Sequence, residues 1–366
     1  MDGLPDVAEA LPKARLDYPF AAPPERGRTL EVAPGVRWIR LPLPFALNHI
    51  NLWAIDDGAG WALVDTGTRT EETVAIWREL FVNHADDKRP LSRVFVTHMH
   101  PDHVGLAGWL TRKFGIRLWM SRLEYLSCRA MVSDTGREAP ADAIAFYRRA
   151  GWSAEAIEAY MARFGNFGKL IHALPDSYRR LSDREEITIG ARRWRVIMGN
   201  GHSPEHACLH CAELGLLISG DQVLPRISSN VSVYPIEPDA NPMQQWLDSL
   251  AMLRIEVPAD TLVLPSHNEP FRGLHDRIAA LETGQQRALD RLRRTLAQAP
   301  RRAIDVFGAL FARSVDPGNV PLLGMATGES IACLNYLLAR GEVVREADAQ
   351  GVDWYRAHPD PSLHAG

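Results

Sequence analysis

The chain has 366 residues, 46% hydrophobic and 23% charged, which is the composition of a soluble globular protein with one large domain or a large and a small one. Its net charge of −4 and pI near 6.4 give no general reason to expect nucleic acid or an anionic membrane as a partner. No uninterrupted apolar run reaches the roughly 18 residues of a membrane span, and residues 1–29 form an acidic, proline-rich lead-in without the apolar stretch of a signal peptide, so we expect a cytoplasmic protein.

The first part of the chain alternates β-rich runs with helical spacing. We expect strands over residues 36–43, 50–57, 60–67, 91–98 and 116–121, and helices over 68–83 and 104–115. Thr70 is a candidate N-cap of the first helix, and Gly115 is a candidate C-cap of the second.

A helical insertion follows, and then the β pattern returns. Residues 122–182 are mostly helical in pattern, and β-rich runs recur over 185–199, 207–221 and 261–267. Asn241 and Pro242 are a typical N-cap and first residue for a helix over 241–254. β-rich runs that flank helices in both halves predict a sheet core covered by helices, with the insertion as a cap.

Ligand-type side chains gather immediately after the predicted strands. "THMHPDH" places four of them in six positions, and three more follow later strands. They are His98, His100, Asp102, His103, His202, Asp221 and His267. Imidazole with carboxylate suits zinc, iron or manganese better than calcium. Seven groups are too many for one tetrahedral ion, so we expect two ions that share a carboxylate and hold a hydroxide between them.

Cys208 and Cys211 form a CxxC pair, which is a zinc or redox motif in other contexts. The stretch "ACLHC" has the pattern of a strand, and a spacing of three then directs the two thiols to opposite faces. No second CxxC completes a zinc site, so we interpret the pair as buried small residues.

Taken together, "THMHPDH", the later "GHS", "GD" and "SH" elements and "LVDTG" resemble the ordered motifs of the metallo-β-lactamase superfamily over residues 30–272. The resemblance implies a four-layer αβ/βα sandwich of the α+β class with metals at one edge. It assigns His98, His100 and His202 to one metal, and Asp102, His103 and His267 to the second. Asp221 would bridge the two ions.

The same resemblance implies roles around the ligands. Asp65 would fix a ligand loop by hydrogen bonding, although an Asx-turn before Gly67 is the alternative. Asp102 or Asp221 would orient the nucleophile or take its proton. His206 would support the ligands or play a structural part. Glu205 stands where the family turn commonly has glycine, and the sequence does not say whether it faces the site.

Substrate contacts are expected from the insertion and from the loop after Asp221. In the insertion, aromatic residues alternate with arginines, which would suit an anionic group with an apolar tail or simply helix packing with solvated arginines. The candidate contact residues are Tyr178, Arg226, Asn230 and Tyr234, with Ser229 beside them.

Residues 273–366 are expected to form a long helix and a small C-terminal domain. Helical patterns over 301–313 and 327–341 and a two-stranded wing over 342–357 resemble the winged-helix tail of some superfamily members. From residue 300 on there are six basic and eight acidic residues, which disfavours nucleic-acid binding. The basic residues at 287–294 are the exception, and a solvated helix face is their commoner meaning. We expect a packing or homodimer-forming role for the tail.

Two classes of function remain open. The first is a binuclear metallohydrolase of small esters, with acyl thioesters of the coenzyme A or glutathione type ahead of lactones. The second is a nucleic-acid protein, either an RNA endonuclease using the same metals or a protein that binds through the winged helix. The acidic charge favours the first class, with a small molecule as substrate.

Overall fold

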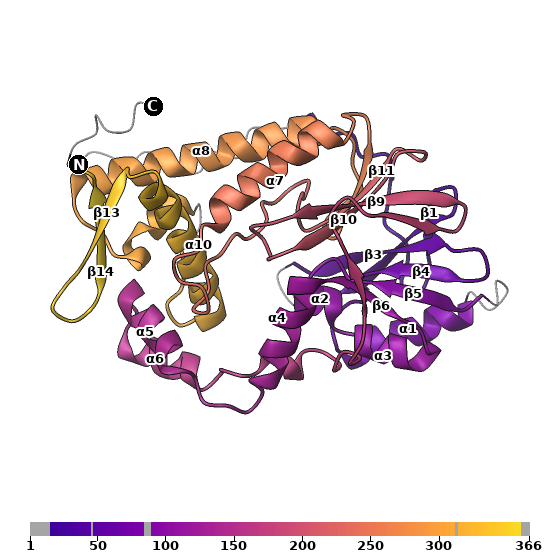
Figure 1. The fold of residues 1–366 in the computed structure, drawn as a ribbon, viewed down its shortest axis with the longest axis horizontal. Helices are drawn as coiled ribbons and strands as arrows, with labels where there is room; N and C mark the ends of the chain where they lie inside the picture. Colours follow the sequence, from indigo (N-terminus) through magenta and orange to yellow (C-terminus); the bar gives the residue numbers. More distant parts are fainter. Residues whose placement is uncertain (1–14, 45–46, 84–88, 312–313, 360–366) are drawn as a thin grey trace.

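The computed structural model describes residues 15–44, 47–83, 89–311 and 314–359, so half of the lead-in lies outside the described residues. Two β-sheets face each other and helices cover their outer faces (Figure 1). This confirms the predicted α+β sandwich. Helices α1 and α3 lie on one side, and α7 and α8 lie on the other. Their bounds are α1 Glu71–Asn83, α3 Ala107–Phe114, α7 Pro242–Glu256 and α8 Leu274–Gln298.

The first sheet has seven strands in the order β1 to β7. The first four strands pair antiparallel, and β4 to β7 pair parallel. Parallel strands end at the same edge of a sheet, so the loop after β5 opens where ligands commonly bind. The strands are β1 Leu30–Ala33, β2 Val36–Pro42, β3 His49–Asp56, β4 Trp61–Val64, β5 Leu91–Phe95, β6 Leu118–Ser121 and β7 Arg179–Leu181.

The second sheet has the order β12-β11-β10-β9-β8, in which only β11 and β12 pair parallel. Its strands are β8 Glu186–Ile189, β9 Arg192–Gly199, β10 His206–Cys211, β11 Leu216–Gly220 and β12 Leu262–Pro265. The alternation of side chains along β10 places Cys211 in the core between the sheets and Cys208 in the core beneath α7 and α8. This agrees with the prediction that the thiols face opposite ways, and both are free.

Local signals in the sequence set the ends of several helices. The Thr70 hydroxyl accepts a hydrogen bond from the N–H of Thr73 at 3.1 Å, and the Asn241 side chain accepts one from Gln244 at 3.2 Å. Gly115 ends α3 in the left-handed conformation with φ 63°. The three predicted caps are therefore confirmed.

The insertion contains the predicted helices, but they do not form one cap. They are α4 Arg122–Ser133, α5 Ala141–Ala150 and α6 Ala154–Met161, followed by a 3₁₀ turn over Phe167–Lys169. Helix α4 packs its Tyr125 and Cys128 against the outer face of the first sheet. Helix α5 and the following loop pack Phe146 and Trp152 into the core that contains the C-terminal helices. The insertion therefore joins opposite ends of the molecule (Figure 1).

The C-terminal part differs from the prediction in one element. Instead of a helix over 301–313 there are a 3₁₀ turn, Ala303–Val306, and a single helical turn, α9 Phe307–Leu310. The Asp305 carboxylate accepts the backbone N–H of Arg302 at 3.0 Å at the start of the turn, and an extended Phe311 ends α9. Helix α10 (Val320–Ala339) starts earlier than predicted, because Asn319 caps it.

The predicted two-stranded wing is present as an antiparallel hairpin of β13 (Val343–Ala347) and β14 (Asp353–Ala357). Its identification as part of a winged helix stays a prediction. Within the described residues, α10 alone is long and apolar enough to cross a membrane. The molecule itself buries 61% of the most apolar 18-residue stretch of that helix, as expected for a core helix.

Candidate metal centre

The predicted ligands converge at one edge of the sandwich from four loops. Strand β5 ends at Phe95, and the chain passes through His98 to the short helix α2 (Pro101–Val104). Pro101 at the start of α2 requires an extended residue before it, and His100 has that conformation (φ −62°, ψ 145°). This brings His98, His100, Asp102 and His103 to the loops after β9, β11 and β12, which supply the other three residues.

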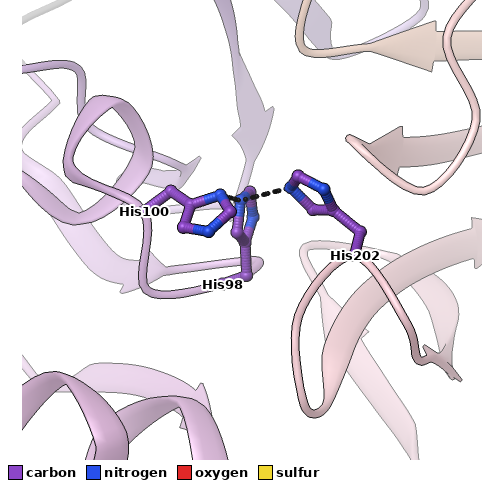
Figure 2. A group of neighbouring side chains, drawn as sticks. All are labelled: His98, His100 and His202. Atoms are coloured by element: carbon purple, nitrogen blue, oxygen red, sulfur yellow. Dashed lines mark hydrogen bonds between the residues drawn. The ribbon is translucent and has the colours of Figure 1, made fainter. Parts of the chain in front are cut away.

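His98, His100 and His202 form the first candidate site (Figure 2). The Nε2 atom of His98 lies 2.9 Å from Nδ1 of His100 and 3.2 Å from Nε2 of His202. Two nitrogens bound to one tetrahedral zinc at about 2.0–2.1 Å would lie roughly 3.3 Å apart. The spacing in the structure is therefore close to that of a ligand set.

The second candidate site consists of Asp102, His103 and His267, and Asp221 lies between the two sites. His267 Nε2 lies 3.5 Å from Asp102 Oδ2 and 3.4 Å from Asp221 Oδ1. The other oxygen of Asp221, Oδ2, lies 3.5 Å from both His103 Nε2 and His202 Nε2. One carboxylate thus faces histidines of both sites.

Two atoms in this cluster test whether a metal fits. Within the described residues, the buried atoms His103 Nε2 and Asp221 Oδ1 have no hydrogen-bond partner. Buried polar atoms without partners are rare in proteins, because desolvation is costly. A cation between them would satisfy both, and the nitrogen and oxygen donor set suits zinc, iron or manganese. The residues therefore fit a metal centre.

Hydrogen bonds to the other ring nitrogens set the histidines' orientation. His202 Nδ1 donates to the carbonyl of Asn230 at 2.7 Å, and His267 Nδ1 donates to the carbonyl of His49 at 2.9 Å. Both rings consequently present Nε2 to the centre, and a bond of this type raises the basicity of a metal ligand.

Asp65 holds His103 and the ligand loop at once. Its Oδ2 lies 2.8 Å from His103 Nδ1, and its Oδ1 accepts the backbone N–H of Thr97 at 2.8 Å. The Thr97 hydroxyl also donates to Asp65 and lies 3.1 Å from His98 Nδ1. The structure therefore supports the expected hydrogen-bonding role of Asp65.

His206 lies beside the cluster, with its ring 4.9 Å from that of His98. Its Nε2 accepts the backbone N–H of Asp221 at 3.0 Å. Gly220 must be glycine here, since an added Cβ would lie 2.4 Å from the His206 ring. His206 thus fixes the backbone of Asp221 and so helps to position this candidate ligand.

The protonation states of His98, His100 and Asp102 suit metal binding. Burial lowers the pKa of His98, and it lowers the pKa of His100 to about 3, so both rings are neutral at pH 7. Burial opposes ionisation of Asp102, but His103 and His267 outweigh it and lower its pKa to about 2. Burial also opposes protonation of His267, yet Asp221 and Asp102 raise its pKa to about 10. A cation would replace that proton.

The four predicted substrate residues lie in different surroundings. Asn230 adjoins the centre, since its carbonyl holds His202. Tyr178 stacks on Tyr125 at 3.9 Å between ring centroids, and Arg226 pairs with Glu269 at 2.8 Å. Tyr234 is 45% exposed. Ser229 is buried, with its hydroxyl bonded to the carbonyl of Asp221.

The arginines of the insertion that have described partners point to packing. Arg129 pairs with Asp176, Arg149 with Asp353, and Arg179 with Glu185. These contacts favour helix packing with arginines outside over a grip on an anionic substrate.

Sequence analysis missed two residues that hold the His267 loop. Asn51 lies in β3, where its amide donates to the carbonyls of Pro265 at 2.9 Å and Asn268 at 2.8 Å. The His49 ring accepts the backbone N–H of Asn268 at 2.8 Å. A polar asparagine within an otherwise apolar strand, fully buried in the structure, is the signal that could have found the first of them.

The seven candidate ligands lie within a region of the chain that matches a known protein family. Residues 47–295 match the Metallo-beta-lactamase superfamily, and residues 289–358 match the Metallo-beta-lactamase-like, C-terminal domain. A crystal structure of a beta-lactamase domain protein from Burkholderia ambifaria is 43% identical. Its TM-score is 0.85, and the match covers 93% of this chain and 98% of that chain.

Other relatives with lower sequence identity include proteins of the same family and a probable metallo-hydrolase. The metallo-beta-lactamase family protein TTHA1429 from Thermus thermophilus is 26% identical with a TM-score of 0.71, covering 89% of this chain and all of that chain. The probable metallo-hydrolase YqjP of Bacillus subtilis is 25% identical over 287 residues, which is 75% of this chain and 84% of YqjP. An atrochrysone carboxyl ACP thioesterase of Aspergillus fumigatus is 24% identical over 255 residues, which is 69% of this chain but 46% of that protein.

Proposed function

This chain is a metallo-hydrolase of the metallo-beta-lactamase superfamily, and we propose that it uses two divalent ions, zinc before iron or manganese, to hydrolyse an acyl thioester. The observation that carries the proposal is the position of Asp221. One of its oxygens faces His103 and His202, and the other faces His267, so this carboxylate can serve both candidate sites.

The chemistry follows from the donor set. Two divalent ions held there would supply activation of water and polarisation of the scissile bond. Asp102 is the more accessible carboxylate, with 20% of its side chain exposed against 10% for Asp221. We therefore assign to Asp102 the role of orienting the attacking water. Asp221 would hold the two metal sites at a fixed distance from each other.

A thioester is favoured over RNA by the carboxylate partners of five arginines in the tail. Arg293 pairs with Glu342, Arg302 with Asp305, Arg340 with Glu342, Arg345 with Asp239 and Arg356 with Glu346. An arginine that is already paired with a carboxylate contributes little to phosphate binding and counterion release. One distant relative is an acyl carrier protein thioesterase, which supports the same class of bond.

Exposed apolar side chains near the centre support an acyl group. Leu123 and Leu126 of α4 are 44% and 52% exposed, and Met325 of α10 is 48% exposed. The N–H of Leu123 bonds to Glu205, three residues from His202. The carbonyl of Met325 accepts the hydroxyl of Ser232, two residues from Asn230. Exposed apolar side chains beside the His202 loop and beside the loop after Asp221 suit a hydrocarbon chain.

The test is release of free thiol from acyl-coenzyme A and acyl-glutathione substrates, with a structured RNA incubated in parallel. We expect thiol release that a chelator abolishes and intact RNA. His100→Ala should lower turnover by more than the roughly 100-fold typical of changes around metal ligands. His275→Ala is the matched control, because the one hydrogen bond of its ring within the described residues is to the carbonyl of Val257, and it lies outside the cluster.

Cleaved RNA with untouched thioesters would replace the proposal with a nuclease. Full activity of His100→Ala would contradict the metal assignment itself. Inertness toward both substrates in a protein that retains two ions would exclude thioesters, and lactones would become the next substrates to assay.

A further inference from the structure

A buried carboxylate outside the ligand set lies between two ligand loops. Glu124 belongs to α4, the first helix of the insertion, and is fully buried. Its Oε2 accepts the backbone N–H of Met99 at 2.9 Å, and Met99 lies between His98 and His100. Its Oε1 accepts the backbone N–H of Glu205 at 2.9 Å, in the loop that carries His202. One side chain thus joins the segments that supply all three histidines of the first site.

The loop that carries His202 also contacts α4 through the side chain of Glu205. Oε2 of Glu205 accepts the backbone N–H of Leu123 at 2.8 Å. Leu123 is in the first turn of α4, whose N-cap residue Ser121 makes no capping hydrogen bond through its side chain. A carboxylate there satisfies a free N–H and interacts favourably with the helix dipole. The helix and the loop therefore hold each other.

We propose that the Glu124–Glu205 clamp, meaning these two carboxylates and the backbone N–H groups of Met99, Leu123 and Glu205, positions the first metal site. Glu124 is its central positioning residue. This inference rests on the proposed metal centre, and it makes α4 part of the active-site framework. The spacing of His98, His100 and His202 then depends on a helix that contributes no ligand.

The two acceptor oxygens of Glu124 allow the clamp to be tested by a substitution that changes little else. Each oxygen of Glu124 accepts a different backbone N–H, so both must be acceptors. Glutamine has nearly the same shape but only one acceptor, and its amide would face a donor at the other contact. Glu124→Gln should therefore separate one ligand loop from α4 with little change in volume.

The matched control is Asp57→Asn. Asp57 is a partly buried carboxylate, with 8% of its side chain exposed. It also joins two segments, since it accepts the side chains of Ser92 and Arg93 and the backbone N–H of Gly190. Ser92 and Arg93 are at the start of β5, whereas the ligand loop follows the end of that strand. The control disturbs the fold by a similar change but at the opposite edge of the sheet.

The experiment is a titration of the metal-depleted full-length protein and its variants with zinc(II), and with cobalt(II) for its absorption spectrum. We expect Glu124→Gln to bind one of its two ions about 10–100-fold less tightly, with a changed cobalt spectrum. Its kcat should fall more than KM rises. Glu205→Ala, which leaves the buried carboxylate intact, should weaken binding several-fold. Asp57→Asn should lose thermal stability while its metal affinity and spectrum stay those of the wild type.

Wild-type affinity and spectrum in both clamp variants would overturn the clamp while leaving the metal centre in place. Equal losses in Glu124→Gln and Asp57→Asn would also overturn it, because a general loss of stability would then explain the effect. A wild-type protein that binds no divalent ion would instead contradict the proposed function. If Glu124→Gln does not fold, Glu205→Ala decides the question alone.

Discussion

Asp65 combines a ligand-supporting role with a backbone conformation that few residues accept. It is one of three described non-glycine residues with positive φ, at 63°. Left-handed backbone at a non-glycine residue is uncommon, and asparagine tolerates it as well as aspartate does. The free-energy cost of this backbone conformation is offset by the hydrogen bonds of the carboxylate to Thr97 and His103.

Asp65→Asn should therefore keep the backbone but impair the second site. The amide has one acceptor, so if its oxygen stays on Thr97 its NH₂ group faces His103 Nδ1. The imidazole would then carry its proton on Nε2, the atom needed for the metal. We expect about 10–100-fold weaker binding of one ion, measured by zinc titration. Unchanged binding of both ions would show that Asp65 serves only the turn before Gly67.

Individual residues show what could be predicted from sequence. The seven candidate ligands follow strand ends and form motifs of fixed spacing, so short-range order was enough to single out residues that the fold brings together. His49, Asn51 and Glu124 act on segments that lie 25 to 219 positions away in the chain. A single polar residue within an apolar strand or a helix gives no sign of which distant loop it will contact.

At the scale of an element, α10 reaches the candidate metal centre through the side chain of Glu329. Glu329 accepts the side-chain N–H of Asn230 at 3.0 Å, and the carbonyl of Asn230 holds His202. The backbone N–H of Val233 donates to the carbonyl of Gly328 at 3.0 Å, so helix and loop are joined at adjacent positions. The loop after Asp221 is consequently set by the C-terminal part.

Burial raises the pKa of Glu329 from 4.5 to about 7, although Asn230 opposes the rise. Between these values the folded protein keeps a proton that the unfolded chain has released, so this group's contribution to stability falls as pH rises from 4.5 to 7. Glu329→Gln keeps an acceptor for Asn230 and does not titrate. Its stability relative to wild type should increase across this range by about 1–3 kcal/mol.

Urea unfolding of both proteins at about pH 5 and about pH 8 measures the difference in their free energies of unfolding. These two pH values lie on either side of most of the titration of Glu329. The other titrating groups are common to both proteins, so their contributions cancel. A relative stability that is independent of pH would contradict the raised pKa of Glu329.

Elements with strong local signals were predicted, and those fixed by packing were not. The caps at Thr70, Gly115 and Asn241 lie within a few residues of the helices they end, and the structure has all three. The helix expected over 301–313 has helical spacing but stops after a single turn at Leu310. Phe307 and Leu310 instead pack against the large core beneath the second sheet.

At the scale of the whole molecule, the insertion and the tail share a core with the second sheet. Trp152 of the insertion donates its indole N–H to Thr327 of α10 at 2.9 Å. Leu334 and Leu337 of α10 belong to the same buried cluster as Leu289 and Leu292 of α8. The family match for the C-terminal domain begins at residue 289, within α8, so the matched region starts inside a helix that both parts use.

Removal of residues 300–366 should therefore prevent folding of the whole chain rather than only change substrate choice. Leu323, Ile331, Leu334 and Leu337 are each 5% exposed or less, and full burial of such a side chain contributes about 1.5–3 kcal/mol. Four of them together approach the roughly 5–15 kcal/mol by which a domain is stable. The truncation would also expose Leu289, Leu292 and Leu296 of α8. We expect a protein that aggregates and lacks a cooperative thermal transition, measured by size-exclusion chromatography and calorimetry against the full chain. A truncated protein that is monomeric, unfolds cooperatively and binds two ions would show that the tail folds apart from the catalytic core. Loss of thiol release in that protein would then assign the tail a direct part in substrate binding, through the loop that α10 holds beside His202.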